Sequence, residues 1–88
     1  MEYFLFSYPN CSDCEDLKSY LKKIGVEAGE YSLILKESKL KIREFLPRIK
    51  RDDKGAIILP SLVLQEEGEV VTVLNSCLEL EEWLKSRA

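Results

Sequence analysis

The sequence predicts an α/β fold built on a four-stranded mixed sheet with helices on both faces, in the order β-α-β-α-β-β-α. An apolar run at residues 3–7, a helical pattern and a second apolar run at 31–35 form a βαβ unit. Its two strands are therefore expected to be parallel, with a right-handed crossover. Two later apolar runs flank a Glu-Glu-Gly turn, which is typical of an antiparallel hairpin. A last helical pattern closes the chain.

The first strand and helix have strong local signals. Residues 3–7 are continuously apolar and aromatic up to Ser7, which suits a central strand buried on both faces. We expect the first helix over residues 12–24, ended by Gly25. Its core face is predicted from positions three or four residues apart, namely Cys14, Leu17, Leu21 and Ile24.

The middle of the chain is predicted to contain a strand at 31–35 and a second helix capped by Ser38. The core face of that helix would be Ile42, Phe45, Leu46 and Ile49. Pro47 should end or kink the helix, because proline lacks the N–H and restricts the residue before it. Residues 48–51 would then form a further turn or a loop, and residues 52–55 a turn.

The last third predicts a hairpin and a helix. Pro60 precedes the apolar run 62–64, and a turn at 66–68 leads into the strand 70–74. Ser76 and Glu79 have the spacing of a capping box, which predicts the start of the final helix. The inner face of that helix would be Cys77, Leu80, Trp83 and Leu84.

Length and composition predict one small domain spanning 1–88. The net charge of −3 argues against nucleic acid and anionic membranes as partners. The chain has no histidine, which excludes His-based triads and His metal ligands. It shows neither a signal peptide nor a membrane-spanning apolar stretch, so we expect a cytoplasmic protein.

Cys11 and Cys14 are the candidate catalytic residues. Cys11 falls at or just before a helix N-terminus, where unpaired N–H groups and the helix dipole favour a thiolate. Cys14 lies one helical turn later and can attack a mixed disulfide formed on Cys11. The acidic residues Asp13, Glu15 and Asp16 oppose the dipole, which favours a stable disulfide and a reducing protein. This pattern predicts a thiol-disulfide oxidoreductase that acts by dithiol exchange.

The strand, the Cys-Ser-Asp-Cys helix start, the Leu59-Pro60 pair before a hairpin and the closing helix together resemble a glutaredoxin, of the thioredoxin-fold superfamily. The resemblance covers essentially the whole chain. It implies a cis peptide bond at Pro60 and a substrate paired to the backbone of Leu59. It also implies that the turn formed by Asn75 and Ser76, a Gly-Gly turn in the family, borders the same groove. Tyr8 stands where a lysine is usual and would be a substrate platform or a strand-end aromatic.

The resemblance implies no bound cofactor and no metal. Protein or glutathione mixed disulfides would be the substrates, with glutathione as a co-substrate and glutathione or a reductase as the electron donor. This places the protein in redox homeostasis and electron transport.

Alternative interpretations remain open from the residues. A Cys-x-x-Cys pair is also half of a zinc or iron–sulfur site, although the chain offers only Cys77 as a third Cys or His ligand. A redox-inert interaction module on the same fold is the other alternative. Cys77 itself would be a small core residue, a regulatory thiol or an extra ligand. A basic run would be a solvated face, or would bring Arg48 or Arg51 to a carboxylate of glutathione or of an acidic partner; it comprises Lys36, Lys39, Lys41, Arg43, Arg48, Lys50, Arg51 and Lys54.

Overall fold

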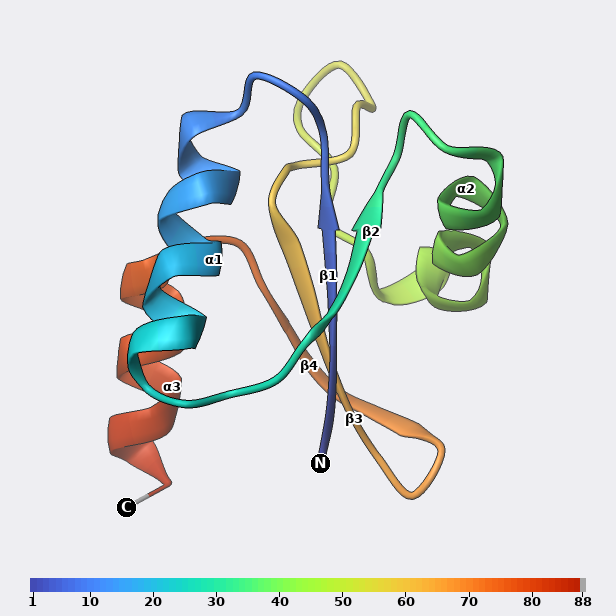
Figure 1. Cartoon of the computed structure of the whole chain (residues 1–88). Coiled ribbons are helices and arrows are strands. Elements are labelled where there is room, and N and C mark those ends of the chain that lie inside the picture. The colour runs from blue at the N-terminus through green and yellow to red at the C-terminus, as the bar shows by residue number, and fades with distance from the viewer. Residues whose placement is uncertain (88) are drawn as a thin grey trace.

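A computed structural model describes residues 1–87 of the chain (Figure 1). In chain order its elements are β1 (Glu2–Ser7), α1 (Ser12–Lys23), β2 (Gly29–Ser32), α2 (Lys36–Ile42), the 3₁₀ helix η1 (Arg43–Arg48), β3 (Ser61–Glu66), β4 (Glu69–Leu74) and α3 (Cys77–Ser86). The strands form one sheet in the order β2-β1-β3-β4. β1 and β2 are parallel, whereas β1 with β3 and β3 with β4 are antiparallel. The predicted mixed sheet and element order are confirmed.

Helices cover both faces of the sheet, with α1 and α3 on one side and α2 on the other (Figure 1). Successive residues of a strand point to opposite faces, so β1 supplies Leu5 to one core and Phe6 to the other. The core under α1 and α3 consists of Leu5, Leu17, Leu21, Leu62, Leu64, Leu74 and Leu80. The core under α2 and η1 consists of Phe6, Leu33, Ile42, Phe45, Ile49, Val63 and Val73.

The ends of α1 and α3 follow the predicted signals. After α1, Gly25 has a φ of +76°, a left-handed conformation that glycine adopts without steric cost. At the start of α3, the Ser76 hydroxyl accepts a hydrogen bond from the N–H of Glu79 at 3.1 Å. The inner face of α3 is also confirmed, since Leu80 is fully buried and Cys77, Trp83 and Leu84 pack against its cluster.

The predicted position of β2 is wrong. The strand was expected at 31–35 but lies at Gly29–Ser32. The register with β1 explains the difference, because Ser7, the last residue of β1, is opposite Ser32 and leaves no partner for a longer strand. The chain then turns, so that Leu33 is buried while Ile34 and Leu35 are exposed. The apolar run at 31–35 therefore predicted too late a strand, because its last two residues, Ile34 and Leu35, lie in the following turn and are exposed.

The predicted start of α2 is also wrong. The helix is capped by Leu35 rather than Ser38, and the N–H of Lys39 donates to the carbonyl of Leu35. Ser38 is the third residue of the helix and is buried. The α-helix ends at Ile42 and continues as the 3₁₀ helix η1, which contains Pro47. A proline ring collides with the carbonyl four residues earlier, here that of Arg43, which explains why the α-helical part stops just before that residue.

The remaining predictions for this region hold better. Of its predicted core face, Ile42, Phe45 and Ile49 are buried and Leu46 is partly buried. The turn at 52–55 is confirmed by the hydrogen bond from the N–H of Gly55 to the carbonyl of Asp52.

No helix within residues 1–87 combines the length and the apolar character needed to cross a membrane.

Candidate dithiol site

The turn after β1 places Cys11 immediately before the first residue of α1. Asn10 has a φ of +61°, which asparagine tolerates better than most residues and which reverses the chain direction. Cys11 is the N-cap of α1, as predicted, and its sulfur accepts a hydrogen bond from the N–H of Cys14 at 3.1 Å. The helix therefore starts on the candidate nucleophile itself.

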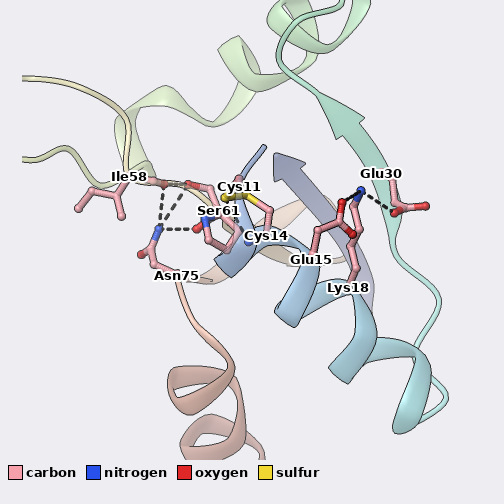
Figure 2. The surroundings of a disulfide bond; sticks show 9 residues. Cys11, Cys14, Glu15, Lys18, Glu30, Ile58, Ser61 and Asn75 are labelled. Carbon is pink, nitrogen blue, oxygen red and sulfur yellow. Dashed lines mark hydrogen bonds and ion pairs between the residues drawn. A yellow bond between two sulfur atoms is a disulfide. The ribbon is translucent and has the colours of Figure 1, made fainter. Parts of the chain in front are cut away.

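The Cys11 and Cys14 sulfurs form a disulfide (Figure 2), with the two Cα atoms 5.2 Å apart. The two cysteines differ in access to solvent. Cys14 is 1% exposed, whereas Cys11 is half-buried and, with Asn10, Ser12 and Glu15, lines an open hollow of about 450 Å³. An incoming thiol can therefore reach the Cys11 sulfur, while Cys14 is covered by the protein.

The loop at 58–61, here called the Pro60 loop, lies at the end of the sheet from which the Cys11 turn departs. Ser61 is opposite Phe6 in the β1–β3 register, so the loop comes beside the end of β1 from which the Cys11 turn departs. The Leu59–Pro60 peptide bond is cis, which confirms the expectation drawn from the resemblance. Pro60 is buried, and the Ser61 hydroxyl donates to the carbonyl of Ile58 at 2.7 Å.

The other predicted site residues are placed as follows. Asn75 lies across the Pro60 loop, and its amide nitrogen donates to the carbonyls of Ile58 at 3.2 Å and Pro60 at 3.0 Å. Ser76 caps α3, so its hydroxyl is engaged by the helix. Tyr8 directly follows β1 and is about half exposed. The structure thus brings Asn75 to the loop, with Ser76 next in the chain, and within residues 1–87 shows no hydrogen bond between Tyr8 and either.

Sequence reasoning missed three participants of the site. Ile58 and Ser61 contribute a carbonyl and a hydroxyl to the loop, and Lys50 forms an ion pair with Glu79 at 3.6 Å. Of these contacts, only the capping-box spacing that includes Glu79 could be recognised in the sequence, since the others join residues distant in the chain.

The guanidinium groups of Arg48 and Arg51 donate to the backbone carbonyls of Val70 and Gly55. Among the described residues, no group of three or more Cys, Asp or Glu side chains is arranged to hold a metal ion.

Cys77, at the first turn of α3, is a free thiol. Burial raises the pKa of this thiol above its ordinary value, and the carboxylates of Asp16 and Asp13 raise it further; a backbone hydrogen bond partly opposes them. The two acidic residues lie in the first half of α1, so the starts of α1 and α3 are close enough to interact electrostatically. Cys77 is therefore protonated, and weakly nucleophilic, at neutral pH.

We expect alkylation of Cys77 by iodoacetamide to be slow at pH 7 and to accelerate as the pH rises toward the raised pKa. Replacing Asp16 with asparagine removes one of the charges that disfavour the thiolate, so alkylation at pH 8 should become about twofold faster. Mass spectrometry of the oxidised protein measures this rate on Cys77 alone. The matched variant Asp53→Asn removes a charge in the 52–55 turn and should leave the rate unchanged. Equal rates in both variants would contradict the assigned cause.

The β-α-β-α-β-β-α order, the dithiol at the start of α1 and the cis-proline before β3 together define a protein of the thioredoxin fold. Two solved structures support this class. One is the thioredoxin-like protein BC3987, 18% identical, with a TM-score of 0.60 over 96% of this chain and 97% of that one. The other is a mutant of the same protein, 19% identical, with a TM-score of 0.63 over 94% of this chain and 99% of that one. No protein-family model and no curated protein sequence matches the chain.

Proposed function

We propose that the protein is a glutaredoxin-like thiol-disulfide oxidoreductase that reduces protein or glutathione mixed disulfides. The observation that carries the proposal is the Cys11–Cys14 disulfide at the N-terminus of α1, in which Cys11 is partly exposed and lines an open hollow while Cys14 is buried. The thioredoxin fold agrees with this chemistry. Glutathione would act as a co-substrate, and glutathione or a reductase would supply the electrons.

The reaction would begin with both cysteines reduced. The Cys11 thiolate attacks one sulfur of the substrate disulfide, forms a mixed disulfide and releases the other sulfur as a thiolate. The Cys14 thiolate then attacks the Cys11 sulfur, forms the Cys11–Cys14 disulfide and releases the second substrate thiolate. Two electrons pass from the dithiol to the substrate, and the released thiolates take up protons from solvent. An external thiol reductant restores the dithiol.

The substrate would lie along the Pro60 loop, paired to the backbone of Leu59 beside Pro60. Tyr8 and the turn of Asn75 and Ser76 would border it. This arrangement is supported by geometry, because the loop ends opposite Phe6 in the sheet register and so lies beside the dithiol turn. It also fits the partly exposed Cys11, which lines an open hollow large enough to admit a second thiol.

The direct test is mass spectrometry of the metal-free protein equilibrated in a series of glutathione redox buffers. The Cys77→Ser variant leaves two cysteines, so any intramolecular disulfide in it joins Cys11 to Cys14. We expect this disulfide to form reversibly. Related proteins span roughly −120 to −270 mV, and the acidic first turn of α1 should place the midpoint in the reducing half of that range.

A glutathione adduct on Cys11 in the same experiment would support a true glutaredoxin. The proposal fails if neither the disulfide nor the adduct forms and the purified protein carries stoichiometric metal. That result would instead support the metal-binding alternative.

A further inference from the structure

Asn75, between β4 and α3, is hydrogen-bonded through its side chain to the Pro60 loop (Figure 2). Its Nδ2 donates to the Ile58 carbonyl at 3.2 Å and to the Pro60 carbonyl at 3.0 Å, and lies 3.4 Å from the Ser61 hydroxyl. The residue between the two accepting carbonyls is Leu59. Asn75 thus fixes the backbone on both sides of Leu59.

The backbone of Asn75 closes a ring of interactions around the same loop. Its N–H donates to Oε1 of Glu79 at 3.0 Å, and that oxygen lies 3.6 Å from Nζ of Lys50. The carbonyl of Lys50 accepts the N–H of Ile58 at 3.1 Å. Both backbone polar groups of Ile58 are therefore held by this ring. The ion pair is about half exposed and contributes little, so the loop is restrained by the part-buried bonds of Asn75 together with that of the Ser61 hydroxyl.

The side-chain amide of asparagine suits the two carbonyl acceptors of the Pro60 loop. Two carbonyls that converge on one point need a donor with two hydrogens, and a side-chain amide supplies two. Serine supplies one, and an ionised aspartate supplies none. Within residues 1–87 the other end of the amide, Oδ1, is buried without a hydrogen-bond partner, which is energetically unfavourable. The Asn75 amide therefore binds the loop through Nδ2 at the cost of an unsatisfied Oδ1.

We propose that Asn75 is a positioning residue for the dithiol reaction, and that its side chain acts by holding the Pro60 loop. The inference rests on the proposed function, in which the backbone of Leu59 pairs with a peptide that carries a disulfide. Ordering a loop on binding costs conformational entropy, and a loop that is already fixed avoids that cost. Asn75 therefore selects extended peptide substrates over small thiols, which need no backbone pairing.

The test compares Asn75→Ala with the wild type in two assays. The first is turnover of a peptide disulfide, for which we expect kcat/KM to fall about tenfold, mostly through KM. The second is reduction of the Cys11–Cys14 disulfide by dithiothreitol, for which the rate should stay within about twofold because no docking is involved. The control is Ile42→Val, which removes a methyl group from the buried cluster against which Leu59 packs and leaves the hydrogen bonds of the loop intact. It should leave both rates unchanged.

Asn75→Ser retains one donor hydrogen and should show an intermediate loss in the peptide assay, which also serves if the alanine variant does not fold. The positioning role is overturned if Asn75→Ala and Ile42→Val behave alike, or if the alanine variant loses both rates equally. The proposed function would be overturned as well if the wild-type protein turned over no peptide disulfide although dithiothreitol reduced its Cys11–Cys14 disulfide. The two failures are therefore distinguishable.

Discussion

Replacing Cys11 with serine is expected to reduce disulfide turnover by more than about a thousandfold, because a hydroxyl cannot form the mixed disulfide. Replacing Cys14 with serine should have a different effect. The half-buried Cys11 can still attack the substrate, but no buried thiol is present to resolve the product. The mixed disulfide should therefore accumulate on Cys11.

Peptide mapping after reaction with an unsymmetrical disulfide, under non-reducing conditions, separates these outcomes. We expect the Cys14→Ser protein to carry the adduct on Cys11 and the Cys11→Ser protein to carry none at Cys14. The Cys77→Ser variant controls for loss of a cysteine as such and should turn over close to the wild-type rate, since that thiol is protonated at neutral pH. Adducts on Cys14 in the absence of Cys11 would contradict the assigned roles.

Predictions from the sequence succeeded where the signal was local. The spacing of Cys14, Leu17 and Leu21 with the following Gly25 predicted α1, although the fourth predicted core residue, Ile24, is exposed just after the helix ends. The Ser76–Glu79 spacing did the same for α3. These elements carry the dithiol and border the loop, so much of the site could be predicted from short-range patterns in the sequence.

Predictions failed where distant pairing decides the outcome. The end of β2 depends on where β1 ends, because a strand without a partner cannot continue, and the apolar Ile34 and Leu35 gave no sign of this. The inward direction of the Asn75 amide likewise depends on carbonyls that lie 15 and 17 residues earlier in the chain. The resemblance placed Asn75 at the groove, but the direction of its side chain follows from the folded loop alone.

The largest stability loss is expected at Phe6, which is fully buried in the core under α2. Its ring stacks on Tyr31 with the centroids 5.3 Å apart and meets Phe45 in a tilted arrangement at 6.0 Å. Phe6→Ala removes these contacts and leaves a cavity, at a cost of about 3–5 kcal/mol. The total stability of small domains is about 5–15 kcal/mol, so the variant should be close to unfolding at 37 °C.

Urea denaturation of the oxidised protein, followed by circular dichroism, measures this loss as a lower midpoint with an unchanged slope. The control is Leu78→Ala on α3, whose side chain is 63% exposed and whose loss should stay within about 0.5 kcal/mol. A Phe6→Ala midpoint equal to that of the control would contradict the assigned core.

Phe6 is also opposite Ser61 in the sheet and five residues before Cys11. The same cavity should therefore loosen the contact between the end of β1 and the Pro60 loop, and the folded fraction of this variant should exchange disulfides more slowly than the control.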